Sequence, residues 1–222
     1  MKSKFLLKSN FCFSKLVMTF FIILCGILQG QCVVTDIVRD EKGNILSIKS
    51  YNKVSKNLEL LKLETFHPNG HVARLELFSS GVKNGVHKEF FNNGNIKIDG
   101  QYSDGDKSGL WTEYFREGGT MRMFYANENR KDGSISEWYK NGGKKVSGEY
   151  SQGQKNGLWI AWYPNGVKES VVTFIQGEQE RVFSYFYDNG NKKSEGIVSY
   201  KGQKEQRCWD IDGNTQNCIK GG

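Results

Sequence analysis

Glycine recurs along this chain at an unbroken spacing of 24 residues, and this period limits what the chain can fold into. The series consists of Gly70, Gly94, Gly118, Gly142, Gly166 and Gly190. Asparagine precedes most of these glycines, as in Tyr163-Pro164-Asn165-Gly166, which is typical of a tight turn in which glycine supplies a positive φ. A fixed period of this length predicts a repeat array.

Each repeat has room for two strands of about five to eight residues between its turns. The segments 158–163 (LWIAWY) and 171–175 (VVTFI) are rich in aromatic and β-branched residues, and Asn-Gly between two such runs favours a β-hairpin. A second glycine series with the same spacing indicates the turns that join one hairpin to the next: Gly85, Gly109, Gly133 and Gly157. We therefore predict an all-β fold, an elongated, solenoid-like meander of hairpins in a single curved antiparallel sheet of about twelve to fourteen strands.

The register also distinguishes two neighbouring glycines. Gly142 occupies the turn position and is predicted to need a positive φ, whereas Gly119 lies one place past that position and is not.

The repeats resemble a known family. The pattern G-x-W-x-x-[WY]-Y-x-N-G, with an aromatic residue eight places later and then a further glycine, resembles the variant MORN repeat, which also occurs in YwqK-type antitoxins. The clearest copy is 157–166, followed by Phe174 and Gly177, and the resemblance extends over about 62–206. It implies the hairpin fold and, through its relatives, either sequestration of a toxin or binding to a membrane surface. The chain departs from the pattern at Ala126, where an aromatic residue is expected and Tyr125 stands one place early, and at Arg181 and Glu205, which replace glycine.

The first thirty residues predict export. Four lysines and no acidic residue precede the apolar run 16–28 (LVMTFFIILCGIL), as in a secretory signal peptide. We predict cleavage after Gly30 and an extracytoplasmic location, in the periplasm, at the cell surface or secreted. An uncleaved anchor fits less well because the run is shorter than the roughly 18 residues that span a bilayer. A lipoprotein also fits less well, because Gln31 rather than a small residue precedes Cys32.

The predicted organisation has four parts: a signal peptide at 1–30, capping strands at 31–61, hairpin repeats at 62–206 and a C-terminal capping hairpin at 207–222.

Charge argues against nucleic acid as a partner. The whole chain carries +7, and removal of the four leader lysines leaves about +3 without a concentrated basic face. Four lysines stand two places before the second-series glycines: Lys83, Lys107, Lys131 and Lys155. We interpret them as solvated turn residues; the alternative is a row of cations for an anionic polymer or membrane.

Two cysteines agree with export. Cys208 and Cys218 lie symmetrically about Gly213, so a hairpin turn there would place them directly opposite each other. We predict a disulfide that closes the last hairpin and leaves Cys32 as a single thiol after processing.

The sequence carries no pattern of a catalytic or metal site. Its three histidines, His67, His71 and His87, have no carboxylate or cysteine at a ligand-like spacing, and no nucleophile motif or phosphate loop is present. We therefore expect neither an enzyme nor a bound cofactor.

Recurrent aromatic residues are the candidate binding surface. They are Trp111, Tyr114, Trp138, Tyr139, Trp159, Trp162 and Tyr163. Alternation along the strands puts aromatics on both faces, and a single sheet does not bury both, so the segment 33–62, the curl of the sheet or a partner must cover some of them. The structural alternative is cross-strand packing within the sheet. The hypothesis is an exported, non-enzymatic module that binds or scaffolds another protein, with a glycan or an anionic membrane surface as other partners. The alternative functions are a YwqK-type antitoxin and a membrane-surface module.

Overall fold

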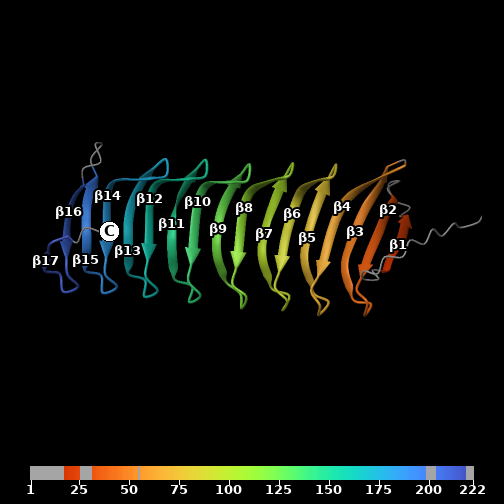
Figure 1. The fold of residues 1–222 in the computed structure, drawn as a ribbon, viewed down its shortest axis with the longest axis horizontal. Coiled ribbons are helices and arrows are strands. Elements are labelled where there is room, and N and C mark those ends of the chain that lie inside the picture. Colours follow the sequence, from red (N-terminus) through yellow and green to blue (C-terminus); the bar gives the residue numbers. More distant parts are fainter. Residues whose placement is uncertain (1–17, 26–31, 55, 199–203, 219–222) are drawn as a thin grey trace, which may run out of the picture.

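The computed structural model describes residues 18–25, 32–54, 56–198 and 204–218, and most of the predicted signal peptide lies outside these ranges. The described strands form one antiparallel sheet, in which each strand pairs with the next along the chain (Figure 1). The strands are β1 Met18–Cys25, β2 Cys32–Arg39, β3 Ile45–Val54, β4 Asn57–Phe66, β5 Val72–Ser79, β6 Val82–Phe90, β7 Ile96–Ser103, β8 Asp106–Tyr114, β9 Thr120–Asn127, β10 Arg130–Trp138, β11 Lys144–Ser151, β12 Gln154–Trp162, β13 Lys168–Ile175, β14 Glu178–Phe186, β15 Lys192–Val198, β16 Lys204–Trp209 and β17 Thr215–Gln216.

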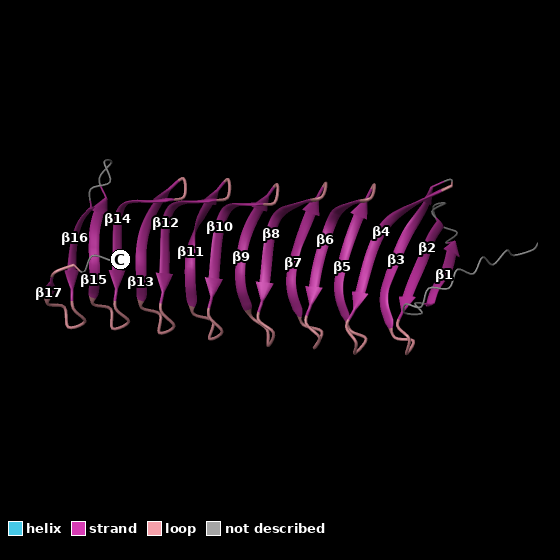
Figure 2. Ribbon diagram, viewed as in Figure 1, coloured by secondary structure: helices cyan, strands magenta, loops and turns pink. Residues whose placement is uncertain are grey.

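The predicted single-sheet meander is confirmed. The described residues contain only strands and connecting turns, with no helix that could cross a membrane (Figure 2). There are more strands than predicted, and one of them, β1, lies within the predicted signal peptide; the predicted capping segment forms the full-length strands β2, β3 and β4. This segment extends the sheet edgewise, so it is ruled out as one of the three alternatives for covering a face.

The Asn-Gly turns stack on one another from repeat to repeat. Each is a five-residue loop such as 163–167, where Gly166 has a φ of +86° and its N–H donates to the Tyr163 carbonyl. The Asn165 side chain accepts from Val167 N–H and donates to the Asp188 carbonyl in the following turn, 2.7 Å away. Asn69, Asn93, Asn141 and Asn189 make equivalent bonds to the next turn. The repeated turn is therefore a hydrogen-bonded ladder along one edge of the sheet.

The prediction that separated Gly119 from Gly142 is wrong. Gly119 has a φ of +81° and Gly142 a φ of +83°, so both need the left-handed region. The reason is local: the turn at 115–119 places two consecutive glycines, Gly118 and Gly119, at positive φ.

The second-series glycines lie inside strands. The connection between β7 and β8 is a two-residue turn, Asp104-Gly105, with both residues at positive φ, whereas Gly109 is the fourth residue of β8. The pairing shifts between Asp99 and Gln101 on β7, opposite Gly109, which marks a β-bulge. A bulge bends and twists its strand, so these glycines serve the curvature of the sheet and not its turns.

One face of the sheet, which we call the buried face, carries a column of covered side chains at the 24-residue spacing. The column consists of His87, Trp111, Ile135, Trp159 and Phe183. The facing position on the preceding strand is occupied by Glu76, Gly100, Phe124, Gly148 and Val172. Where the column has tryptophan, the facing residue is glycine: a Cβ on Gly148 would lie 2.3 Å from the Trp159 ring. Large and small residues therefore alternate so that each layer is filled.

Lysines cover this column. Lys107 Nζ lies 4.3 Å from the centre of the Trp111 ring, and Lys155 Nζ lies 4.5 Å from that of Trp159. Lys83 and Lys131 sit similarly over Tyr102 and Tyr150. All four are half-buried strand residues, so their interpretation as solvated turn residues is wrong. Their stems and charges pack on aromatic rings, as amphipathic cations do at the border of a core.

Candidate protein-binding face

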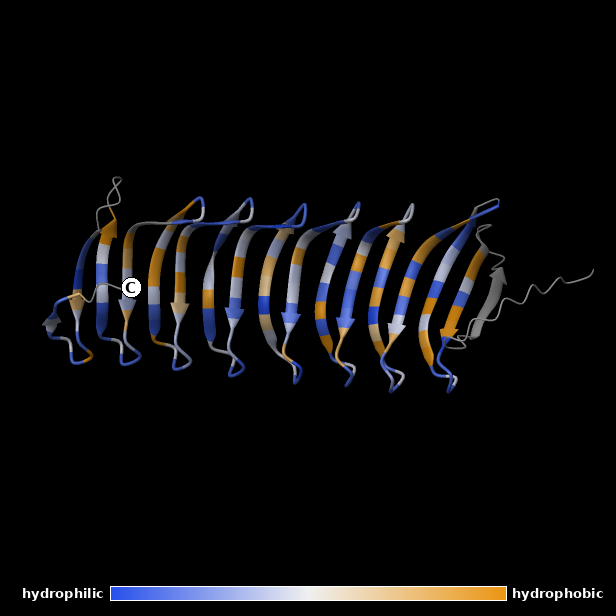
Figure 3. Cartoon of the chain, viewed as in Figure 1, coloured by the Kyte–Doolittle hydropathy of each residue, from blue (hydrophilic) through white to orange (hydrophobic). Residues whose placement is uncertain are grey.

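The opposite face of the sheet, which we call the open face, exposes apolar side chains. Because neighbouring strand residues point to opposite faces, the residue before each buried-column position points to the open face. These residues are Val86, Leu110, Ser134, Leu158 and Val182, and the four apolar ones are exposed. The row has the same 24-residue spacing as the buried column. Figure 3 shows apolar and polar segments alternating along the strands.

The next strand widens this row at two places. Leu110 on β8 pairs with Tyr125 on β9, which is also exposed. Val182 on β14 lies beside Ile197 on β15, and both are 55% exposed. Neighbouring exposed apolar side chains of this size are typical of surfaces that bind a partner.

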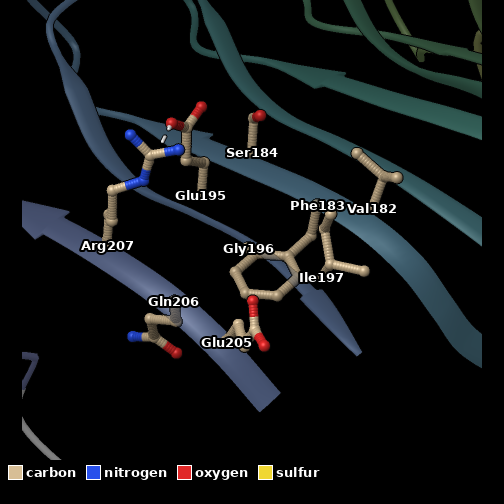
Figure 4. Close-up of a pocket in the computed structure, with 9 residues that line it drawn as sticks. All are labelled: Val182, Phe183, Ser184, Glu195, Gly196, Ile197, Glu205, Gln206 and Arg207. Atoms are coloured by element: carbon tan, nitrogen blue, oxygen red, sulfur yellow. Dashed lines mark ion pairs between the residues drawn. The ribbon is translucent and has the colours of Figure 1, made fainter. Parts of the chain in front are cut away.

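Shallow grooves follow the row. One of about 570 Å³ crosses β6 to β9 and is lined by Val86, Leu110, Tyr114 and Met123, among others. A second, of about 210 Å³, continues to β10 and is lined by Leu110, Tyr125, Ser136 and Trp138. A third, of about 410 Å³, lies at β14 to β16 (Figure 4). In that view Val182 and Ile197 stand together, and Glu195 faces Arg207 at 3.9 Å.

The predicted candidate aromatics separate into three groups. Trp111 and Trp159 are 2% and 7% exposed, so they are core residues of the buried face and not part of a binding surface. The physical reason is that each ring packs flat over a facing glycine. Tyr114 and Trp138 are half-buried and line the grooves of the open face. Trp162 is half-buried too, with Lys144 Nζ 5.7 Å from its ring.

Tyr139 and Tyr163 belong to the turn ladder. Tyr139 Oη donates to the Trp162 carbonyl at 2.7 Å, and Tyr163 Oη donates to the Phe186 carbonyl at 2.8 Å. His67 occupies the same turn position as Tyr139 and Tyr163, and its Nε2 lies 2.9 Å from the Phe90 carbonyl oxygen. Burial raises the pKa of Tyr139 and of Tyr163, and nearby carboxylates add to this. These hydroxyls therefore stay protonated as donors.

Sequence reasoning missed the aliphatic row. It singled out recurrent aromatic residues such as Trp111 and Trp159 but not the residue before each. The signal was present, because Val86, Leu110, Leu158 and Val182 repeat with the same period. The deviation at 125–126 has a related explanation: Ala126 fills the buried face and Tyr125 joins the open face.

A buried polar cluster ends the aromatic column. Glu76 Oε1 lies 2.7 Å from Lys83 Nζ and 3.3 Å from His87 Nδ1, and both Glu76 and His87 are almost fully covered. Burial lowers the pKa of His87, and Glu76 and Glu89 oppose that effect only in part. The His87 ring packs against Tyr102 and Trp111. A histidine and carboxylate so deeply covered have no open path to a substrate, and the described residues contain no group of three or more ligands that could hold a metal.

The cysteine pair lies at the C-terminal end of the sheet. The sulfur atoms of Cys208 and Cys218 are 2.07 Å apart, which is disulfide distance. The two residues are not directly opposite, because Cys208 pairs with Gln216. The turn at 210–214 centres the hairpin on Asp212 and not on Gly213, which shifts the register and leaves Cys218 beyond the last paired residue.

The fold and these faces define an open-sheet β-hairpin repeat protein. The family model described as MORN repeat variant matches residues 83–104 and 155–176, so the chain carries MORN repeat variants, as its pattern indicated. The two matches lie three repeats apart in the same register, and each spans one hairpin with its Asn-Gly turn. MORN repeats are in general modules that bind proteins or membranes, and the family is not one of enzymes. No curated protein matches the chain.

Proposed function

We propose that this protein is an exported, non-enzymatic module that binds another protein through its open face. The observation that carries the proposal is the row of exposed aliphatic side chains, Val86, Leu110, Leu158 and Val182, spaced by one repeat on one face of a rigid sheet. An array of this kind presents a long surface on which a partner can bury several anchors at once.

Protein fits the open face better than a polyanion does. The cations that recur once per repeat lie on the buried face, against aromatic rings. On the open face, Lys88 is neutralised by Asp99 at 2.9 Å, and Arg207 faces Glu195. Because the exposed residues of the row itself are apolar, affinity would come chiefly from hydrophobic burial, and salt would change it little.

Two features support export. The N-terminal segment has the charge and apolar run of a secretory signal, and a cysteine pair at disulfide distance is suited to an oxidising compartment. The antitoxin alternative requires the chain to remain in the cytoplasm with its toxin. Location therefore discriminates between these two functions.

The export part is tested by N-terminal sequencing and intact mass of the protein from its native cells. We expect a chain that begins at Gln31 in the extracytoplasmic fraction. A cytoplasmic chain that retains residues 1–30 would favour the antitoxin function, and acyl chains on Cys32 would show a lipoprotein.

The binding part is tested with the double variant Leu110→Asp/Leu158→Asp in the full chain. We expect it to fold like the wild type, because both side chains are exposed, and to lose its co-purifying protein partner. Ile211→Asp is the matched control: Ile211 is 50% exposed, comparable to Leu158 at 54%, but lies in the last turn away from the row. Equal partner recovery from both variants would rule out the open face. Flotation of all three proteins with anionic vesicles would instead favour the membrane-surface function.

A further inference from the structure

We propose that the processed protein forms a symmetric dimer in which β2 pairs with β2 of a second copy. The inference rests on the proposed export, because cleavage after Gly30 removes β1. In the complete chain, β1 covers the edge of β2 over eight residue pairs, from Met18 with Arg39 to Cys25 with Cys32. Its removal leaves a row of backbone N–H and C=O groups without a neighbouring strand.

The two ends of the sheet differ in how their edges are protected. At the C-terminal end the last strand, β17, has only two residues, and the chain beyond it is tied back through Cys208 and Cys218. A short, crosslinked edge resists pairing with other chains. At the other end, β2 reads CVVTDIVR over eight residues, with four aliphatic residues and neither proline nor glycine. Such an edge is β-prone, and Asp36 is the single charged residue inside it, since Arg39 ends the strand.

Geometry restricts how two β2 strands can pair. On an edge strand, alternate residues turn their backbone groups outward, so in a symmetric antiparallel pair each residue meets one an even number of positions away. A twofold axis at Thr35 pairs Thr35 with itself, Val33 with Ile37 and Cys32 with Val38. An axis at Asp36 would place two carboxylates directly opposite each other, which is unfavourable. The Thr35 register avoids that contact, because it sets Asp36 against Val34 of the other copy, and it joins Thr35 to Thr35 and Val33 to Ile37.

A second copy suits this edge for a further reason. The twofold axis of an antiparallel strand pair is perpendicular to the sheet, so both copies keep their open faces on the same side. The rows that contain Leu110 and Leu158 would then lie on one continuous sheet of twice the length. The dimer would thus present two equivalent binding faces to one partner, which raises apparent affinity without new contacts to it.

The test uses the complete chain expressed in a secreting host. The processed form is purified after N-terminal sequencing, and its mass is measured by light scattering from about 1 to about 100 µM, because an interface below about 1,200 Å² is weak. We expect the mass to rise toward that of two chains, and the amides of β2 to exchange more slowly at the higher concentration. A single-chain mass throughout would overturn the dimer.

Variants identify the edge. Thr35→Arg places like charges on the axis and is expected to weaken the dimer by about tenfold or more. The control is Ser50→Arg, because Ser50 pairs with Thr35 from the inner strand β3 and lies away from the edge. Equal dimerisation of the two variants, both folded by circular dichroism, would contradict pairing through β2. A processed chain that stays monomeric refutes only the dimer, whereas failure of cleavage in the native cells refutes the proposed export.

Discussion

At the scale of single residues, the buried face is organised by paired volumes. Trp159 packs over Gly148, whereas the equivalent pair one repeat earlier is Ile135 with Phe124. The two solutions fill the same space with opposite assignments of large and small residues. Close packing of this kind makes each residue dependent on its partner and less on its own hydrophobicity.

This dependence predicts a compensating exchange. Gly148→Phe alone should destabilise the fold by about 2 kcal/mol or more, because the new side chain overlaps the Trp159 ring. Trp159→Ile alone should also destabilise the fold through the cavity it leaves, by less than the roughly 3–5 kcal/mol typical of tryptophan replaced by alanine. The double variant copies the pair Phe124–Ile135, and it should recover most of that loss. Urea unfolding of the four proteins gives the coupling energy, and strictly additive effects would contradict paired volumes.

His87 makes the stability depend on pH. Its pKa is lowered in the folded protein, chiefly by burial, so the folded state takes up a proton less readily than the unfolded state. The free energy of unfolding is therefore highest above the ordinary histidine pKa of about 6.5, and it declines as the pH falls below that value. Thermal unfolding from pH 8 to pH 5.5 should show this decline in the wild type and a smaller one in His87→Phe. Parallel curves for the two proteins would contradict it.

Which tryptophans are buried was not predictable from alternation alone. The sequence places Trp159 and Trp162 on opposite faces, and the structure agrees. What alternation does not reveal is which face is covered. Trp159 is covered because it packs against the facing Gly148 and lies under Lys155 from the start of its own strand. Gly148 itself lies at the bulge between β11 and β12. The covering groups are ordinary residues whose role appears only when the strands are paired.

At the scale of elements, the recurring turn is both a local and a long-range structure. Asn165 closes its own turn and bonds the next one, and Tyr163 does the same through its hydroxyl. The local part was predictable from Asn-Gly. The contact across 23 residues was not, because it requires the stacking of repeats. Similarly, the second-series glycines read as turns because they lie only four residues after the true two-residue turns, such as Gly105 before Gly109.

The hydrogen-bonded ladder of turns predicts opposite effects on stability for two substitutions. Tyr163→Phe removes the donor to the Phe186 carbonyl and should cost about 1 kcal/mol. Phe115 occupies the same position two repeats earlier without a hydroxyl, so Phe115→Tyr should add a bond to the next turn and stabilise by a similar amount. Chemical denaturation measures both. Shifts of the same sign would contradict the ladder.

The terminal hairpin predicts a local effect of the cysteine pair. Replacing Cys208 and Cys218 with serine should lower the stability of this hairpin by about 2–3 kcal/mol, a modest amount because the loop that the disulfide closes is short. Faster hydrogen exchange should be confined to β15, β16 and β17, since each repeat depends mainly on its neighbours. Global unfolding of the double variant would show that the pair supports the entire array.

At the scale of the molecule, the described strands form one sheet with one covered face and one open face. Period and turn chemistry were enough to predict the sheet, because each repeat independently favours the same hairpin. Which face is buried and which is exposed was not predictable, because the same 24-residue period runs through both faces. Trp111 and Leu110, for example, belong to series with the same spacing. Only burial separates core from surface: Trp111 is 2% exposed and Leu110 is 38% exposed.

Site-specific photo-crosslinking tests whether the open face binds a protein. A benzophenone side chain is placed at Leu158 or at Ile211, two positions of nearly equal exposure, in the full chain expressed in its native cells. We expect a discrete protein adduct at Leu158 and none at Ile211. Adducts of equal yield at both positions, or an adduct at Ile211 alone, would contradict it.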